Sequence, residues 1–250
     1  MNNSEIKKIA SLKQTKYRKE SGLFTVEGNK LVQELINSRF NIDSITVTAS
    51  WIEKNKNLAE KLPKYDIITS KQMTQISNMV TPPGILATAA TPEYHIDSKD
   101  SEHEMLLMLD GINDPGNLGT IIRTADWFGI NKIVTSEDTS EPWQPKVIQS
   151  SMGSIFRIKI MECDIVKFLN EVKTPVYGAL MEGKDIYNTH IIGNKGVIII
   201  GSESHGIRKN IMQNISCPVN IPRGNGRMTE SLNASIAAGI IMSEIFRKNR

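Results

Sequence analysis

The stretch "MLLMLDGINDPGNLGTIIRTADWFGI", Met105 to Ile130, decides the fold class. It opens with a nearly continuous apolar run, of the kind that is buried in a parallel sheet. A turn-rich segment with proline and glycine follows and leads into a helix-like stretch with one apolar face. That face is formed by Leu118, Ile121, Ile122, Ala125 and Phe128. A buried strand, a polar turn and an amphipathic helix together indicate an α/β protein.

The alternation of strands and helices continues to the end of the chain. The predicted strands are "KIVTSE", "IFRIKIM", "PVYGALM", "GVIIIGSE" and "CPVNIP". Helices are predicted at Leu118–Phe128, Pro145–Met152, Ile165–Val172 and Ser231–Phe246. Strands that alternate with helices predict a parallel sheet covered on both faces.

A second, smaller α/β unit precedes this sheet. Helix-like and strand-like segments alternate from the start of the chain to about Ala90. The segment "TPEYHIDSKDSEHE" that follows is polar, charged and without periodicity, which is typical of a linker. The predicted domains are therefore residues 1–90 and 105–250, joined by a linker at 91–104.

The composition is that of an ordinary globular protein, with 39% hydrophobic and 23% charged residues. No apolar run reaches the roughly 20 residues of a membrane span, and "MNNSEIKKIA" lacks an apolar signal core. Cys163 and Cys217 form no disulfide framework and lack metal-ligand spacing. The histidines are scattered: His95, His103, His190 and His205. We expect a cytoplasmic protein without membrane contact and without a metal site.

Basic residues gather near the start, although the net charge is only +3. They are Lys7, Lys8, Lys13, Lys16, Arg18 and Lys19. A solvated helix face and a contact surface for phosphates both explain such a cluster. Charge alone leaves both interpretations open.

The end of the first strand of the second domain carries polar groups in a place where parallel sheets bind ligands. We expect Asn117 to cap the helix that follows, and Arg123 to lie off the apolar face, over Gly119 and toward the loop. A surface ion pair of Arg123 with Asp126 is the alternative. The segment has neither the G-x-G-x-x-G nor the G-x-x-x-x-G-K-[ST] nucleotide spacing.

A second strand end, "GVIIIGSESHGI", places Gly201, Glu203 and Gly206 directly after an apolar strand. Glycine lets a ligand approach the backbone, and the Glu203 carboxylate could hold a polar group or orient a neighbouring side chain. An ordinary turn between strand and helix is the alternative.

The third strand end, "IPRGNGRMTESLNASIAAGI", is a glycine loop with arginines that leads into the last helix. Thr229 or Ser231 can cap this helix. Ser231, Asn233 and Ser235 are polar where a buried helix should be apolar, which predicts a site. The alternative is capping combined with helix contact through the small residues Ala234, Ala237, Ala238 and Gly239.

Taken together, the three strand ends resemble the SpoU/TrmH family of RNA 2′-O-ribose methyltransferases, within the SPOUT superfamily. The matching motifs are "NDPGNLGTIIRTADWFG", "VIIIGSESHG" and "IPRGNGRMTESLNASIAAGI", which span most of Asp110 to Phe246. The first ninety residues resemble the family's substrate-binding domain through "KYRKESGLFTVEG" and "TPPGILA". That domain is similar to a small ribosomal-protein-type RNA-binding fold.

The resemblance implies both a fold and an activity. The second domain would contain a deep trefoil knot, which holds S-adenosylmethionine and forms a homodimer interface. The substrate would be RNA, methylated on a ribose 2′-hydroxyl without a metal. Ribosomal RNA and transfer RNA are both substrates in the family, and the two-domain layout favours ribosomal RNA.

The resemblance also assigns residues. Asn117 and Arg123 match the first motif's asparagine and catalytic arginine, Glu203 matches the glutamate of the second, and Ser231 and Asn233 match the third motif's Ser-Leu-Asn. Cofactor contacts are expected around Leu180, Gly201, Ile221 and Leu232. The loop at 223–230 looks longer than in better-known relatives, which leaves its conformation open.

A ribose hydroxyl is a poor nucleophile until its proton is removed or its developing charge is stabilised. Because the pKa of arginine lies above about 12, we favour Arg123 as a clamp on a substrate phosphate that also stabilises the alkoxide. A general-base role, which the family implies, remains open. Asn117, Ser231 and Asn233 would hold the ribose and the cofactor, and Glu203 would position one of them. Two further arginines could close over RNA phosphates, Arg223 and Arg227.

Two other functions are compatible with parts of the sequence. The first is a catalytically inactive RNA-binding protein on the same fold, which is disfavoured because all five motif residues are present. The second is a nucleotide-binding metabolic enzyme of the Rossmann type, which the missing glycine fingerprint disfavours.

Overall fold

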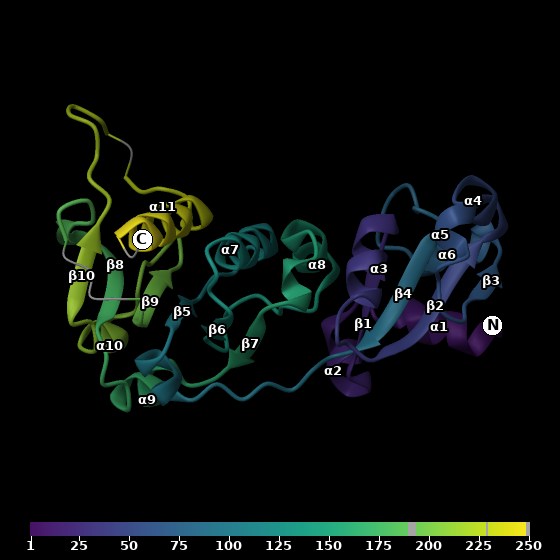
Figure 1. Ribbon diagram of the computed structural model, residues 1–250, viewed down its shortest axis with the longest axis horizontal. Coiled ribbons are helices and arrows are strands. Elements are labelled where there is room, and N and C mark those ends of the chain that lie inside the picture. Colours follow the sequence, from purple (N-terminus) through teal and green to yellow (C-terminus); the bar gives the residue numbers. More distant parts are fainter. Residues whose placement is uncertain (190–193, 229, 249–250) are drawn as a thin grey trace. The chain divides into compact units, whose positions relative to one another are not determined.

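The structure, a computed structural model, describes residues 1–189, 194–228 and 230–248. It divides into two compact units, residues 1–92 with 141–156 (unit 1) and residues 93–140 with 157–250 (unit 2). Figure 1 shows the helices and strands of each unit, coloured along the chain. Within the described ranges no helix is long and apolar enough to cross a membrane.

Unit 1 is built on a four-stranded sheet with the order β1-β4-β2-β3. Its strands are β1 (Leu23–Glu27), β2 (Ile42–Thr48), β3 (Asp66–Ile68) and β4 (Ile85–Ala90). Strand β4 is antiparallel to β1 and β2, and β2 is parallel to β3. The ends of β1, β2 and β3 therefore lie at the same edge of the sheet as the start of β4.

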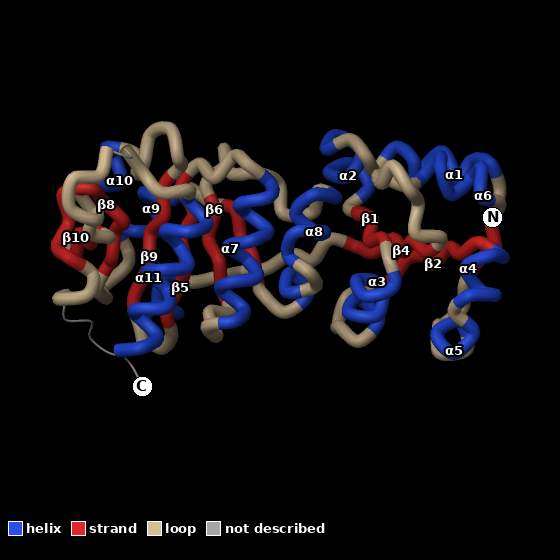
Figure 2. Tube along the Cα trace, turned by 90° about the horizontal axis from the view of Figure 1, so that it is seen from above, coloured by secondary structure: helices blue, strands red, loops and turns tan. Residues whose placement is uncertain are grey.

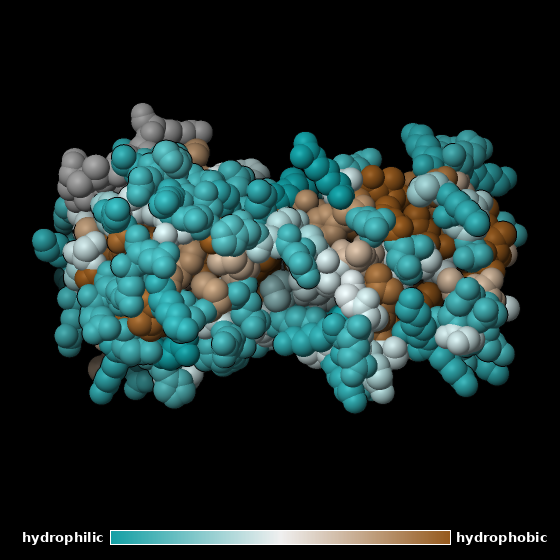
Figure 3. All heavy atoms as spheres, turned by 90° about the horizontal axis from the view of Figure 1, so that it is seen from below, coloured by the Kyte–Doolittle hydropathy of each residue, from teal (hydrophilic) through white to brown (hydrophobic). Residues whose placement is uncertain are grey.

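Short helices surround this sheet. They are α1 (Asn3–Ser11), α2 (Thr15–Ser21), α3 (Asn29–Ile36), α4 (Ala49–Lys54), α5 (Lys56–Ala59), α6 (Ser70–Ile76), α8 (Pro145–Ser151) and the 3-10 helix η2 (Ser154–Phe156). Helix α2 is not predicted from the sequence, because its residues lack an apolar period. On the face drawn in Figure 3, hydrophobic residues (brown) gather over unit 1 between hydrophilic side chains (teal).

Residues 141–156 pack with the N-terminal segment, although the predicted boundaries place them in the second domain. The ring of Trp143 lies 5.0 Å from that of Phe24, and Phe156 lies 5.4 Å from Phe40, measured between centroids. These contacts join residues more than a hundred positions apart, so local sequence patterns do not reveal them. A fragment without residues 1–90 would expose these rings.

Arg18, which belongs to the basic cluster near the start, is buried in unit 1 and only 3% exposed. Its guanidinium donates two hydrogen bonds to Glu141, at 2.9 and 2.5 Å, and a third to the carbonyl of Leu12 at 2.7 Å. The phosphate interpretation is therefore wrong for Arg18, since its charge is already paired. The remaining members of the cluster are exposed: Lys7, Lys8, Lys13, Lys16 and Lys19.

Replacing Arg18 by alanine should destabilise unit 1, because Glu141 would keep a largely buried charge without its partner. We expect the free energy of unfolding to fall by about 3 kcal/mol. Lys19→Ala, which removes an exposed charge from the same helix, should change it by less than about 0.5 kcal/mol. Urea denaturation of the three proteins measures the difference, and equal stabilities would contradict a structural role for Arg18.

Unit 2 contains the parallel sheet that the sequence predicts, with the order β10-β8-β9-β5-β6-β7 and parallel pairing throughout the described strands. The strands are β5 (Met105–Asp110), β6 (Lys132–Thr135), β7 (Lys159–Glu162), β8 (Val176–Asp185), β9 (Gly196–Gly201) and β10 (Cys217–Asn220). The helices are α7 (Pro115–Trp127), α9 (Ile165–Asn170), α10 (Lys209–Met212) and α11 (Ala234–Lys248). The trefoil knot expected from the resemblance stays a prediction.

The helices of unit 2 pack in pairs beside the strands, as Figure 2 shows in blue and red. Leu106 and Met108 of β5 share a core with Phe168 of α9 and Ile211 of α10. Helices α7 and α11 pack against each other, and the ring of Phe128 after α7 lies 5.5 Å from that of Phe246. Alternate residues of a strand face opposite sides, so the apolar run Met105–Leu109 of β5 contributes to two buried layers.

Much of the segment predicted as a linker, 91–104, folds with unit 2. Ile96 is buried in the unit 2 core, and residues Ser98–Glu102 form the 3-10 helix η1. The ammonium of Lys132 lies 2.8 Å from the carboxylates of both Asp100 and Glu104. Polar composition alone did not reveal this packing, because one buried isoleucine and an ion-pair cluster hold the segment.

Candidate functional site

The turn after β5 positions the first group of site residues. Helix α7 begins at Pro115, and its N-cap is Asp114, whose side chain accepts a hydrogen bond from the backbone N–H of Asn117 at 2.8 Å. The prediction that Asn117 caps this helix is therefore wrong, because proline is preorganised for the first helical position and the preceding aspartate satisfies the orphan donor. Asn117 lies in the first turn instead, and its side-chain amide is available for other contacts.

The side chains of Asn117, Glu203 and Asn233, one from each strand end, meet in one hydrogen-bonded group. Glu203 Oε1 accepts from Asn117 Nδ2, from Asn233 Nδ2 at 2.9 Å and from the backbone N–H of Ala234 at 3.3 Å. Asn233 Nδ2 also lies 3.1 Å from Asn117 Oδ1. Hydrogen bonds to an ionised carboxylate are stronger than neutral ones. The three motifs therefore form one structural unit, which we call the Glu203 network.

Asn233 also caps α11. Its Oδ1 accepts from the backbone N–H groups of Ser235 at 3.0 Å and Ile236 at 3.3 Å, and from the Ser235 hydroxyl at 2.6 Å. The prediction that Ser231 caps this helix is wrong, since the helix begins only at Ala234. Two predicted positions, Thr229 and His190, lie outside the described residues. The side-chain oxygen of Asn233 thus caps the helix, and its side-chain nitrogen donates to Glu203.

Arg123 and Ser231 are not part of the Glu203 network. Both side chains are exposed, and no hydrogen bond or ion pair joins the Arg123 guanidinium to other residues in the described part of the chain. Asp126, the alternative partner of Arg123, binds Arg157 instead, with Nη2 and Oδ2 2.7 Å apart. The placement of Arg123 over Gly119 stays a prediction.

A cavity of about 620 Å³ opens beside the network, within the size range of small-molecule sites. Its lining includes all four residues predicted to contact the cofactor, Leu180, Gly201, Ile221 and Leu232. Two of the predicted catalytic residues also line it, Glu203 and Ser231. Asn117, Arg123 and Asn233 are not among the lining residues.

An irregular pairing of β8 with β10 creates one wall of this cavity. Pro218 of β10 lies opposite Gly178, but the next residue, Val219, lies opposite Lys184, so residues 179–183 bulge from the ladder. Asn220 Nδ2 donates to the carbonyls of Leu180, at 3.3 Å, and Met181, which holds the bulge in place. The bulge supplies lining residues Ala179 to Glu182.

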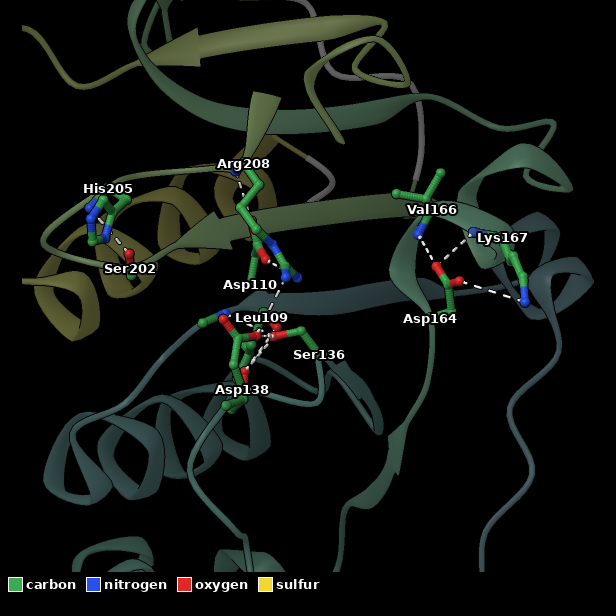
Figure 4. Close-up of polar contacts among 12 residues, drawn as sticks. Leu109, Asp110, Ser136, Asp138, Asp164, Val166, Lys167, Ser202, His205 and Arg208 are labelled. Atoms are coloured by element: carbon green, nitrogen blue, oxygen red, sulfur yellow. Dashed lines mark hydrogen bonds and ion pairs between the residues drawn. The ribbon is translucent and has the colours of Figure 1, made fainter. Parts of the chain in front are cut away.

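An ion pair between the buried Asp110 and the partly exposed Arg208, which we call the Asp110–Arg208 lock, fixes the loop that carries Glu203 (Figure 4). Asp110, at the end of β5, is 1% exposed. Its Oδ2 accepts from the backbone N–H of Arg208 at 2.8 Å, and its Oδ1 lies 2.5 Å from the Arg208 guanidinium. That guanidinium is also 3.7 Å from Asp138, which accepts from the Ser136 hydroxyl at 2.6 Å.

The lock holds the turn from Ser202 to Arg208 against the ends of β5 and β6. This turn contributes Glu203 and His205 to the cavity, so its conformation determines the cavity's shape. A buried carboxylate is costly unless it is paired and hydrogen-bonded, and Arg208 supplies both the one hydrogen bond and the close ion pair of Asp110. Neither residue was predicted as part of the site, although an acid at the end of an apolar run is a signal.

Metal-ligand chemistry is not apparent at this site. In the part of the chain that the structure describes, no group of three or more His, Cys, Asp and Glu side chains could hold a metal ion. Cys163 does not line the cavity, and burial raises the pKa of its thiol to about 11. The candidate site is therefore an apolar cavity beside an asparagine–glutamate network.

Comparison with known proteins gives two family matches. The model of the SpoU rRNA Methylase family matches residues 104–243, and that of the MRM3-like substrate binding domain matches residues 3–87. An uncharacterised tRNA/rRNA methyltransferase of Synechocystis is 29% identical, over 98% of this chain and 92% of its own. The 23S rRNA (guanosine(2553)-2′-O)-methyltransferase RlmP of Bacillus subtilis is 26% identical, over 96% of this chain and 95% of its own.

Two solved structures have the same fold as this chain over nearly its whole length. A TrmH-family protein from Porphyromonas gingivalis superposes with a TM-score of 0.85 and 30% identity, covering 99% of this chain and 98% of its own. The AdoMet-bound rRNA methyltransferase from Sinorhizobium meliloti has a TM-score of 0.82 and 26% identity, covering 98% of this chain and 95% of its own.

Asp110→Asn should loosen the turn that carries Glu203, because it removes the charge that pairs with Arg208. We expect the affinity for S-adenosylmethionine to fall about tenfold, which corresponds to about 1.4 kcal/mol. The matched control is Asp164→Asn at the N-cap of α9, also drawn in Figure 4, where asparagine caps equally well. Isothermal titration gives both values, and an unchanged affinity for Asp110→Asn would contradict the role of the lock.

Proposed function

The chain is a member of the SpoU rRNA methylase family, and on that premise we propose that it methylates a ribose 2′-hydroxyl of RNA with S-adenosylmethionine. Ribosomal RNA is the proposed substrate class, with transfer RNA the second. The observation that carries the proposal is the Glu203 network, which joins the three motifs next to the cavity. A catalytically inactive RNA-binding protein would not need this arrangement.

The cavity fits S-adenosylmethionine, the cofactor of this family. Its walls combine the apolar side chains of Leu180, Ile221 and Leu232 with the backbone of Gly201. Apolar walls suit an adenine ring, and backbone groups of the bulge that lines the cavity would meet its polar edge. When bound, S-adenosylmethionine supplies an electrophilic methyl group on a sulfonium.

We propose that Glu203 acts as a positioning residue. Its Oε1 already accepts three N–H groups, so it holds the amides of Asn117 and Asn233 in fixed orientations. An asparagine amide has two donor hydrogens, and Asn117 uses one of them toward Glu203. The second is available for a ribose oxygen. Ser231, exposed at the cavity, would supply a further hydroxyl.

Arg123 is the proposed catalytic residue. It is exposed and carries no intrachain ion pair in the described residues, so its guanidinium is available for a substrate phosphate. A bidentate arginine–phosphate contact would fix the nucleotide and stabilise the developing alkoxide. Arginine holds its proton at neutral pH, which favours this clamp over the general-base role.

The loop after β10 and a second copy of the chain complete the proposal. Arg223 donates to the carbonyl of Glu230 at 2.9 Å, and Arg227 is exposed, so both could meet RNA phosphates.

We propose a homodimer through unit 2, because Trp127 is 82% exposed and Leu232 and Ile236 are also solvent-accessible. Residues 1–90 are the proposed RNA-binding domain, and the match of residues 3–87 supports this.

The experiment that tests the function follows a labelled methyl group from S-adenosylmethionine into unmodified ribosomal RNA and transfer RNA transcripts. After digestion, label should appear in 2′-O-methyl nucleosides, as shown by mass spectrometry. Arg123→Ala should lower the rate by about a hundredfold or more, while S-adenosylmethionine affinity stays within a few fold. Arg157→Ala, which removes an equal charge beside α7, should retain activity.

Ribose methylation and the Arg123 clamp would be contradicted by different outcomes. Label in base-methylated nucleosides, or in neither RNA, would contradict ribose methylation. Full activity of Arg123→Ala would leave the reaction in place but reject the clamp.

A further inference from the structure

The last turn of α11 carries a lysine whose ammonium is occupied by backbone carbonyls. Lys248 Nζ donates to the carbonyls of Ile186 at 2.8 Å, Tyr187 at 3.1 Å and Thr189 at 2.5 Å. An ammonium has three donor hydrogens, so these carbonyls match its full capacity. The side chain of Lys248 is only 16% exposed, whereas lysine side chains ordinarily extend into water. Lys248 therefore ties the end of α11 to the segment that follows β8.

The segment held by Lys248 is bonded to the wall of the cavity. Ile186, which is fully buried, donates its backbone N–H to the carbonyl of Asn220 at 2.9 Å and accepts from Lys248 through its own carbonyl. The Asn220 side chain in turn donates to the carbonyls of Leu180 and Met181 in the bulge. Leu180, Met181 and Asn220 all line the cavity. Two residues thus connect the lysine ammonium to the bulge.

The bulge needs support from outside its own ladder. The pairing of β8 with β10 stops after Gly178 and resumes at Lys184. Gly183 lies so close to β10 that a Cβ atom at this position would be 2.4 Å from the carbonyl carbon of Val219. The far end of the bulge therefore follows the position of β10, and Lys248 holds the chain just beyond that end.

Helix α11 also lines the cavity with its own side chains, those of Ala234, Ala237 and Ile241. Its start is held by the Glu203 network and its last turn by the carbonyls that Lys248 binds. A helix is a stiff element, so a bond at its last turn limits how far the helix and the bulge can move apart. One helix thereby connects the motif residues with the bulge.

We propose that Lys248 is a positioning residue for the cofactor, which sets the spacing between α11 and the bulge through Ile186 and Asn220. The inference rests on the proposed function, since it takes S-adenosylmethionine as the ligand of the cavity. Lys248 is not among the lining residues, so it acts without touching the cofactor. A preorganised cavity needs less ordering when its ligand binds. Loss of the lysine should therefore weaken cofactor binding and leave the chemical step unchanged.

Arg247 provides a matched control on the same helix. The buried carboxylate of Glu244 lies 3.3 Å from Lys248 Nζ and accepts two hydrogen bonds from Arg247, at 2.7 and 2.8 Å. Arg247 has the same charge and the same acidic partner, but its side chain is 67% exposed. Glu244 keeps one cationic partner when the other is replaced, so both variants should fold.

The test compares the full-length wild type with Lys248→Met and Arg247→Met, because methionine keeps an aliphatic chain but has no donor. Isothermal titration should show the Kd for S-adenosylmethionine raised about tenfold in Lys248→Met and within about twofold of the wild type in Arg247→Met. Hydrogen-exchange mass spectrometry without cofactor should show faster exchange of residues 179–189 in Lys248→Met alone.

Methyl-transfer kinetics separate positioning from general stability. In Lys248→Met the KM for S-adenosylmethionine should rise by the same factor as the Kd, while the rate at saturating cofactor and the KM for the RNA transcript stay at the wild-type values. Lys248→Arg, which keeps donors and charge, should recover part of the affinity.

An unchanged Kd in Lys248→Met, or an equal loss in Arg247→Met, would overturn the role of Lys248. A lower rate at saturating cofactor together with faster exchange throughout unit 2 would also overturn it, since the lysine would then serve stability alone. If the wild type binds S-adenosylmethionine but methylates no RNA, the proposed function fails, while the comparison of Kd values still decides the role of Lys248. A wild type that does not bind S-adenosylmethionine would reject both.

Discussion

The hydrogen bonds received by one oxygen of Glu203 are the interaction on which the candidate site depends. Parallel strands end at the same edge of a sheet, so the turns after β5, β9 and β10 meet there, but proximity alone does not fix side chains. Glu203 Oε1 accepts from the Asn117 and Asn233 amides and from the start of α11. A single acceptor thereby links three segments separated by 86 and 30 positions in sequence. The cavity, the cap of α11 and the exposed motif residues are arranged around it.

Two buried carboxylates perform the same task in different units. Asp110 holds the turn that carries Glu203, through Arg208, and Glu27 holds the loop that carries Val80, through Ser77 and Asn78. In both cases a buried charge at the end of a strand is held by a distant loop, through an ion pair and one hydrogen bond for Asp110 and through N–H and O–H donors for Glu27. Burying a charge is costly unless these bonds form, so each loop has one favoured conformation. Each carboxylate thus gives an exposed loop a fixed base.

The sequence predicted features that depend on neighbouring residues and missed those that depend on distant ones. The apolar period of Met105 to Ile130 predicted β5 and α7. The family resemblance pointed to Leu180, Gly201, Ile221 and Leu232, which are among the residues that line the cavity. Asn117 and Ser231 were wrong as helix caps, because Pro115 and Asn233 define where those helices begin. Residues 141–156 were placed with the wrong neighbours, and Arg18 was read as a surface charge, because Glu141 and Trp143 meet the N-terminal segment only in three dimensions.

Substitution of Glu203 tests the central claim most directly, namely that its carboxylate joins the three motifs into one site. Glutamine keeps an acceptor oxygen but loses the charge, whereas alanine removes the acceptor. Initial rates of methyl transfer to the RNA transcript should fall in the order wild type, Glu203→Gln, Glu203→Ala, and the alanine variant should lose about a hundredfold or more. The melting temperature should change little, since Glu203 is exposed. A Glu203→Ala protein with the wild-type rate would contradict the account.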